Sequence, residues 1–143
     1  MGIKISNLTF EQRLVEWCSL RTKAESLPLE DALILINNFW LDPKKKWVPY
    51  YLDWNDQLKW PDPWQLLSDN VYCDLAKALG ILYTISLLDR ADMADAELVL
   101  TDDGSNLVLV AKRKYILNWN KDSIVNNKQK VKPVRQLQQH QIK

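Results

Sequence analysis

The sequence predicts an α+β fold in which helices come first and an antiparallel sheet follows. Apolar residues recur at helical spacing in residues 10–23, 29–40 and 71–88. After residue 89 the pattern changes to two short β-rich runs, 97–101 and 106–110, around Asp-Gly in residues 102–105, which indicates a hairpin. Residues 115–119 form a third such run, so we expect a small three-stranded antiparallel sheet. Helices and strands segregated along the chain are typical of α+β folds.

The first two helices follow from their termini. Thr9 and Gln12 have the spacing of a capping box, which places a helix from residue 10 to about Lys23. Ser26 is the expected N-cap of the second helix, because Leu27-Pro28 suits a first helical turn. The Asp-Pro pair at 42–43 should end it, since the residue before proline avoids helical geometry.

Residues 43–62 form a connection too long for a simple turn. It is rich in aromatic residues, so we expect it to pack on the core. Asp62 should cap a short helix that begins at Pro63. The aromatic residues here and just beyond are Trp47, Tyr50, Tyr51, Trp54, Trp60 and Trp64.

The central element is a helix that begins near Cys73 and runs to about Leu88. Its apolar residues surround much of its circumference, which is typical of a helix in the middle of a fold. They include Val71, Leu75, Leu79, Leu82, Ile85 and Leu88.

Charge divides the chain into two parts. Residues 1–120 hold 13 Lys and Arg against 17 Asp and Glu, a balance of −4, whereas residues 121–143 hold six against one, a balance of +5. The second part is rich in Lys, Gln and Asn and has few apolar residues, so it cannot order itself alone. We therefore expect one globular domain over 1–120 and a basic polar tail over 121–143 that is disordered unless bound.

Composition excludes several classes of function. Only three glycines are present and no G-x-G-x-x-G or Walker-type loop, which disfavours nucleotide binding. Two cysteines do not make a disulfide framework, and both are expected to be reduced. The sequence shows no signal peptide and no apolar run of membrane-spanning length. We expect synthesis in the cytoplasm, no membrane partner and no cofactor.

Four segments between residues 54 and 119 resemble a known family. They are Trp60-Pro61-Asp62-Pro63-Trp64, Tyr72-Cys73-Asp74-Leu75-Ala76, Asn106-Leu107-Val108-Leu109 and Ile116-Leu117-Asn118-Trp119. Their order resembles the aromatic entry, the Cys-bearing helix, the His strand and the Leu-Asp-Asn strand of bacterial transglutaminase-like cysteine peptidases, in the papain-like group. The resemblance implies that fold, with the nucleophile at Cys73.

The same resemblance implies that the catalytic base is missing. The family's His falls at about Asn106 and its Asp at Asn118, and amides do not titrate in the useful range. The chain's single histidine, His140, lies near its end. Cys73, Asn106 and Asn118 are therefore candidates only. The alternative reading is a buried apolar thiol and two strand-end hydrogen-bonding groups.

The acidic residues of this region raise the question of a metal site. Their spacing matches no Ca²⁺ loop, and helix capping accounts for most of them, so no metal is expected. They are Asp53, Asp56, Asp62, Asp69 and Asp74.

The missing base, the aromatic excess and the polar tail favour a non-catalytic protein-interaction component. The block from Trp60 to Cys73 also resembles uncharacterised proteins of tailed phages, which implies a phage structural or assembly role, a pseudoenzyme in the virion. The partners would be other protein subunits, in a homo-oligomer or a phage assembly. The interaction candidates are Trp47, Tyr50, Tyr51, Trp54, Trp60, Trp64, Lys128, Lys130, Lys132 and Arg135.

Two other functions remain open at this point. One is a cysteine hydrolase or transferase that uses Cys73. The other is weak nucleic-acid association, in which lysines of the tail and of Lys112-Arg113-Lys114 follow phosphates.

Overall fold

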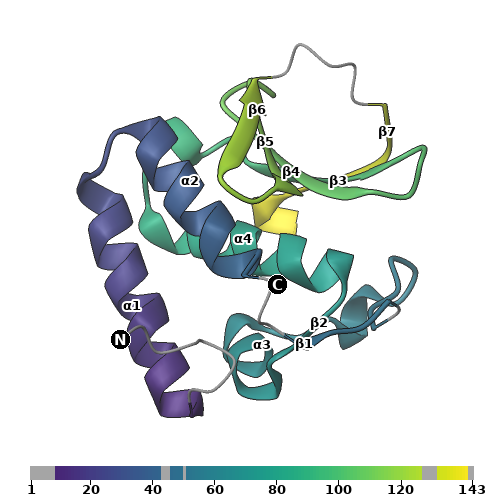
Figure 1. Ribbon diagram of the computed structural model, residues 1–143. Helices are drawn as coiled ribbons and strands as arrows, with labels where there is room; N and C mark the ends of the chain where they lie inside the picture. The colour runs from purple at the N-terminus through teal and green to yellow at the C-terminus, as the bar shows by residue number, and fades with distance from the viewer. Residues whose placement is uncertain (1–8, 43–45, 50, 127–131, 142–143) are drawn as a thin grey trace.

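The computed structural model describes residues 9–42, 46–49, 51–126 and 132–141 and confirms the predicted α+β class (Figure 1). Its four α-helices are α1 (Phe10–Ser26), α2 (Leu29–Trp40), α3 (Pro63–Asp69) and α4 (Asp74–Leu88). Short 3-10 helices lie at Gln57–Lys59, Ala91–Met93 and Gln139–Gln141. The helices precede the main sheet in the chain, and α4 runs below that sheet in Figure 1.

The strands form two sheets. β1 (Lys46–Trp47) and β2 (Val71–Tyr72) make a small parallel pair. The main sheet is antiparallel, with the strand order β6-β5-β4-β3-β7. Its strands are β3 (Glu97–Thr101), β4 (Asn106–Val110), β5 (Tyr115–Asn120), β6 (Ser123–Asn126) and β7 (Pro133–Gln138).

The helix caps agree in part with the sequence. The capping box of α1 is confirmed: Thr9 Oγ1 accepts a hydrogen bond from the Gln12 N–H at 3.2 Å, and Gln12 Oε1 accepts one from the Thr9 N–H at 2.9 Å. The prediction that Ser26 caps α2 was wrong. Ser26 ends α1 instead, with its hydroxyl donating to the Lys23 carbonyl, and the N-cap of α2 is Pro28. The chain between these helices is extended, as expected before a proline.

The core is organised around α4, as its apolar circumference predicted. Trp17 on α1 and Trp40 on α2 are both fully buried, and each indole N–H donates to Thr84 Oγ1 at 2.9 Å. The Thr84 hydroxyl in turn donates to the Gly80 carbonyl at 2.7 Å. A Cβ on Gly80 would lie 2.4 Å from the Trp40 ring, so glycine is what lets α2 approach α4 this closely.

The main sheet has five strands, so the prediction of three was wrong. The two additional strands, β6 and β7, lie within 121–143, the segment expected to be a tail. Each adds to one edge of the predicted hairpin sheet, β6 along β5 and β7 along β3. Edge pairing is made by backbone groups and needs little apolar content. Among the side chains of these strands whose burial the structure describes, Ile124 and Leu137 pack against the core and are half-buried.

Candidate functional site

The three candidates Cys73, Asn106 and Asn118 lie around the N-terminus of α4. Cys73 is the N-cap of α4 and is 3% exposed, and its Sγ accepts a hydrogen bond from the Ala76 N–H at 3.4 Å. Asn106 opens β4 and Asn118 lies in β5, and both are buried. The structure joins these two asparagines through Asp74, the first residue of α4. The structure thus brings the three candidates to one helix terminus, and Asp74, which the sequence analysis considered only among possible caps and metal ligands, lies at the centre of the group.

Asp74, which is half-buried, is the centre of a hydrogen-bond network. Its Oδ2 accepts from the Asn106 N–H at 2.9 Å and from Asn106 Nδ2 at 3.0 Å. Asn118 Nδ2 lies 3.2 Å from Asp74 Oδ1 and 3.1 Å from the Asp74 carbonyl, and it donates to the Asn106 carbonyl at 2.7 Å. A carboxylate in the first turn of a helix is also favoured by the helix dipole. The network ties α4 to β4 and β5.

Two further side chains extend the network, and one of them was not predicted. Trp54 Nε1 donates to Asn106 Oδ1 at 2.6 Å. Asn37 on α2 is fully buried, and its Oδ1 accepts from the Asn118 N–H at 2.8 Å while its Nδ2 donates to the Asn120 carbonyl at 2.7 Å. The only sequence signal for Asn37 was a polar residue beside Ile36 on the apolar face of α2.

Asn118 has an unusual conformation. Its φ is +66°, in the left-handed region that asparagine tolerates better than most residues. The register of β5 with β6 shifts between Ile116 and Asn120, around this residue. Asn118 Oδ1 is buried and has no hydrogen-bond partner among the described residues. The amide nitrogen of Asn118 is thus fully used within the network, whereas its oxygen is not.

Among the described residues, no side-chain base forms a hydrogen bond with the Cys73 thiol. A thiol nucleophile requires a base that takes its proton, and in the described part of the chain Cys73 Sγ has no hydrogen-bond partner except the Ala76 N–H. His140 follows Gln139, whose side chain donates to the Met93 and Ala94 carbonyls beyond the C-terminal end of α4. Because α4 has 15 residues, its ends lie roughly 22 Å apart at about 1.5 Å per residue. The hydrogen-bond network beside Cys73 joins α4 to β4 and β5.

The predicted interaction residues Tyr51, Trp54, Trp60 and Arg135 come together elsewhere. The rings of Trp54 and Trp60 meet edge to face with 5.6 Å between their centroids. The Arg135 guanidinium lies 5.4 Å from the centroid of Trp54, and its Nη1 donates to Asn55 Oδ1 at 2.8 Å. Arg135 belongs to β7, so a residue of the expected tail helps to form this surface.

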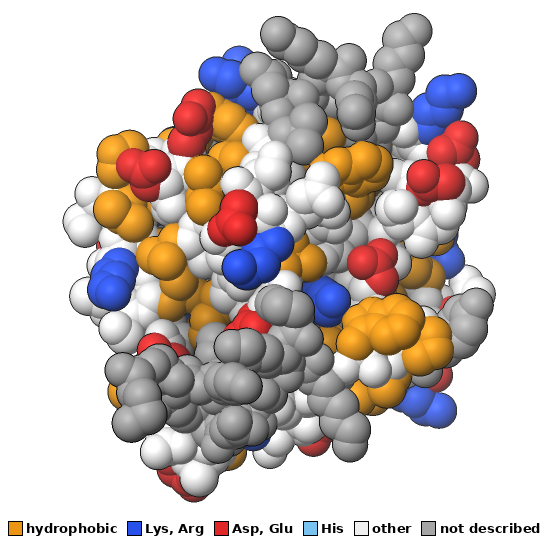
Figure 2. Space-filling model, viewed as in Figure 1, with side chains coloured by type: hydrophobic (Ala, Val, Ile, Leu, Met, Phe, Trp, Pro, Cys, Tyr) orange, Lys and Arg blue, Asp and Glu red, His pale blue; other side chains and the backbone are white. Residues whose placement is uncertain are grey.

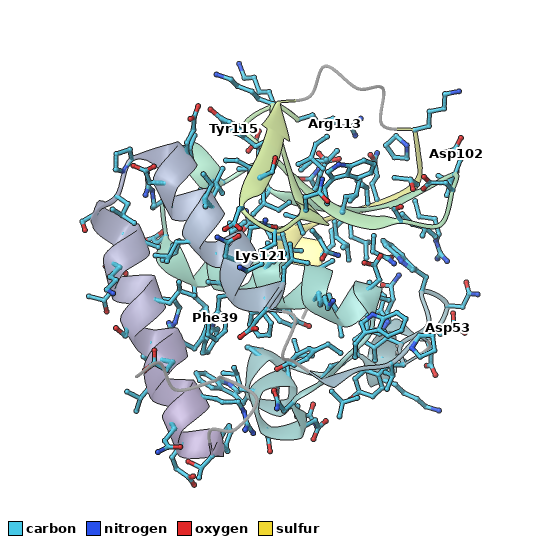
Figure 3. The ribbon with its side chains drawn as sticks, in the orientation of Figure 1. Phe39, Asp53, Asp102, Arg113, Tyr115 and Lys121 are labelled. Carbon is cyan, nitrogen blue, oxygen red and sulfur yellow. The ribbon has the colours of Figure 1, made fainter. Side chains whose placement is uncertain are left out.

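Two hollows flank the segment 51–56, and we call them together the aromatic groove. The larger, of about 510 Å³, is lined by Tyr51, Leu52, Asp53, Trp54, Asn55, Leu100 and Arg135. The smaller, of about 260 Å³, is lined by Tyr51, Leu52, Asp53, Asp56, Lys59, Trp60, Pro61, Gln65 and Asp69. Figure 3 shows Asp53 on the connection at the right of the view, below the sheet.

Three other predicted interaction residues, Trp47, Trp64 and Lys132, do not line the groove. Trp47 is 57% exposed on β1, and Trp64 on α3 is 47% exposed. The rings of Trp64 and Trp17 are nearly perpendicular, with 5.4 Å between their centroids. Lys132 is exposed beside β7. Tyr50, Lys128 and Lys130 lie outside the described residues. Figure 2 shows hydrophobic side chains reaching the viewed face in separate patches, with charged side chains between them.

Among the basic residues considered for nucleic acid, two arginines are engaged by the protein. Arg113 Nη2 donates to Glu97 Oε1 at 2.8 Å and to Gln136 Oε1 at 2.7 Å. Arg135 is held by Asn55, as described above. These contacts use some of the five N–H donors of each guanidinium.

Tyr51 connects the aromatic groove to an acidic residue. Its hydroxyl donates to Asp69 Oδ2 at 3.1 Å. Partial burial of Tyr51, followed by this hydrogen bond to the carboxylate, raises the pKa of its phenol. Tyr51 therefore remains a neutral donor at physiological pH.

The described residues contain no group of three or more His, Cys, Asp or Glu side chains placed to hold a metal ion. None of the helices in this part of the chain combines the length and apolar character needed to cross a membrane. No protein-family model, curated protein or solved structure matches the chain.

Proposed function

We propose that this chain is a non-catalytic protein-interaction component that contacts its partner through the aromatic groove. The observation that carries the proposal is a contrast between two regions. At the N-terminus of α4, Cys73 is 3% exposed, and hydrogen bonds between amides and one carboxylate join this helix end to β4 and β5. At the groove, aromatic and charged side chains line open hollows. Exposed aromatic residues and arginine are the residue types enriched at protein interfaces.

The proposal includes a place for this component among the structural or assembly proteins of tailed phages, with a transglutaminase-like fold that lacks its catalytic His. The resemblance of the block from Trp60 to Cys73 supports this part. The chain order also supports it, since a Cys-capped helix, α4, precedes two strands in which Asn106 and Asn118 stand at the family's His and Asp positions. Detection of the protein in purified virions by mass spectrometry is the test, and its absence from them would remove the virion assignment.

The interaction itself is tested by site-specific photo-cross-linking in the cells that produce the protein. A photoreactive phenylalanine analogue replaces Tyr51, which is 37% exposed in the groove, or Val15, which is 65% exposed on α1 and serves as the control. The analogue at position 51 should give one discrete cross-linked product containing a second polypeptide, and the analogue at position 15 should not. Equal products at both positions, or a product at position 15 alone, would contradict the proposal.

A cysteine hydrolase or transferase is the alternative, and one observation favours it. Cys73, Asn106 and Asn118 do lie at one helix terminus, as the resemblance implied. The alternative requires Cys73 to react in the native protein. Mass spectrometry after brief treatment with iodoacetamide measures this directly, and rapid modification of Cys73 would favour the enzyme over the interaction component.

A further inference from the structure

We propose that the smaller hollow of the aromatic groove binds a lysine side chain from an extended segment of the partner protein. This inference rests on the proposed function and names the chemistry of the partner. Three features of the hollow carry it: its apolar and aromatic walls, its excess of carboxylates, and the distribution of charge along the groove.

The walls suit a long side chain with a cationic end. Leu52 and Pro61 provide apolar surface, and Tyr51 and Trp60 provide aromatic rings. The alkyl stem of lysine packs well on such surfaces while its ammonium group stays near water. Aromatic rings also attract a cation that lies over their faces. Trp60 is held in place because its indole N–H donates to the Asp53 carbonyl at 2.8 Å.

The charge of the hollow is negative. Three carboxylates, from Asp53, Asp56 and Asp69, line it with one cation, Lys59. The Lys59 ammonium lies 3.5 Å from Asp56 Oδ2 and its side chain is 82% exposed. It is therefore directed largely to solvent and leaves the other two carboxylates without a cationic partner among the described residues. This is the charge complementarity that selects a basic group.

Two of these carboxylates are oriented and still have acceptor capacity. Asp53 Oδ1 accepts from the Asn55 N–H at 2.9 Å, and Asp69 Oδ2 accepts from the Tyr51 hydroxyl at 3.1 Å. The second oxygen of each carboxylate has no hydrogen-bond partner within the described part of the chain. An ammonium group has three N–H donors and can use both.

The groove also carries opposite charges at its two ends. The larger hollow contains Arg135, whereas the smaller hollow contains Asp56 and Asp69, and Asp53 lies between them. A basic side chain in the larger hollow would face the Arg135 guanidinium, so the smaller hollow is the favoured place for it. Repulsion between like charges disfavours a basic side chain in the larger hollow, and attraction between opposite charges favours it in the smaller one.

The test uses capped pentapeptides as probes. One has the sequence Gly-Ser-Lys-Ser-Gly, and its control replaces lysine with norleucine, which keeps the alkyl stem and removes the ammonium group. Binding is followed by NMR titration of the ¹⁵N-labelled protein, with the Trp60 indole N–H as a local reporter. The lysine peptide should bind weakly and saturably, and the norleucine peptide about tenfold less tightly, a factor that corresponds to about 1.4 kcal/mol. Equal affinity for the two peptides would overturn the inference.

Isosteric variants locate the site. Asp53→Asn and Asp69→Asn each remove one charge but keep an oxygen to accept from the Asn55 N–H or the Tyr51 hydroxyl. Asp102→Asn removes the same charge from the hairpin, which lies above the groove in Figure 3, and serves as the control. Both groove variants should weaken the lysine peptide several-fold, with shifts lost at Trp60, and the control should not. Equal weakening by all three variants would reveal general electrostatics and overturn the inference.

Failure of this inference is distinguishable from failure of the proposed function. If position 51 cross-links a partner while the protein fails to distinguish the lysine and norleucine peptides, the interaction component stands and the lysine site does not. If the lysine peptide binds in the smaller hollow with the expected dependence on Asp53 and Asp69, the site stands whatever partner the cross-linking identifies.

Discussion

Replacing Thr84 with valine would remove one hydroxyl on which two buried tryptophans depend. Thr84 is fully buried on α4, and its Oγ1 accepts from the indole N–H groups of Trp17 and Trp40 at 2.9 Å each. Valine has nearly the same shape as threonine, so the packing of the three elements is preserved while both indole donors lose their acceptor. The change therefore isolates the polar contribution of this junction.

The expected cost follows from the number of donors left unpaired. A buried donor without a partner costs about 1–3 kcal/mol, so Thr84→Val should destabilise the protein by about 2–6 kcal/mol. This is a large share of the roughly 5–15 kcal/mol by which a domain of this kind is stable. Thr84→Ser keeps the hydroxyl and loses one methyl group, so it should cost only about 1 kcal/mol.

Urea denaturation followed by tryptophan fluorescence measures both variants. With a slope of about 2 kcal/mol per molar urea, a loss of about 3 kcal/mol lowers the midpoint by about 1.5 M. Trp17→Phe should cost less in the Thr84→Val background than in the unmodified protein, because in that background it also removes one of the two unpaired donors. A valine variant as stable as the serine variant would refute the reasoning, since the hydroxyl would then not be what stabilises the two indoles.

Three other changes have expected outcomes. Iodoacetamide should modify exposed Cys18 quickly in the native protein and buried Cys73 only on unfolding, as peptide mass spectrometry would show; equal rates would contradict the burial of Cys73. Gly80→Ala places a Cβ 2.4 Å from the Trp40 ring, and overpacking of this kind costs about 1–3 kcal/mol, which should appear as a lower Tm in calorimetry; an unchanged Tm would show that α2 can move away at no cost. Lys112 has φ +55°, so Lys112→Gly should stabilise by about 1 kcal/mol in urea denaturation; a loss of stability would mean that the side chain makes a contact outweighing the backbone strain.

Local signals were the part of the fold that the sequence predicted best. The capping box at Thr9, the cap at Asp62 and the hairpin around Gly104 all depend on residues within a few positions of one another. Such interactions are independent of the rest of the fold, so their patterns can be interpreted without it. The end of α1 was predicted less well, because the helix continues to Ser26, past the point at which its strong apolar periodicity ends.

The edge strands β6 and β7 could not be predicted from composition. β7 pairs with β3 over five positions, yet most of its side chains are exposed or half-buried. Its stabilisation comes from backbone hydrogen bonds to an edge that exists only once the hairpin has formed. The tail was predicted from the low apolar content of residues 121–143, and apolar content indicates only how much side-chain surface a segment can bury. Arg135 and Leu137 were therefore assigned to a tail.

The same limit applies to the site, where the positions were predicted but not the chemistry that links them. Resemblance placed Cys73, Asn106 and Asn118 near one another, and it did not indicate that Asp74 joins them. Asp74 directly follows Cys73, in a position where an acidic residue is already explained by the helix dipole. Its second role, accepting from Asn106 on β4, depends on a contact between residues 32 positions apart.

The amide groups of this network serve as both donors and acceptors between α4, the sheet and the segment 51–56. A histidine at the position of Asn106 would offer a titratable nitrogen, whereas the Asn106 amide offers both a donor to Asp74 and an acceptor for Trp54. Each of these roles is fixed at every physiological pH, because an amide does not change its protonation. The Asp74 carboxylate accepts from residues of β4 and β5, and Trp54 is held where it lines the larger hollow of the aromatic groove. Under the proposed function, Asn106 thus anchors the aromatic groove to α4, because it bonds to Trp54 on one side and to Asp74 on the other.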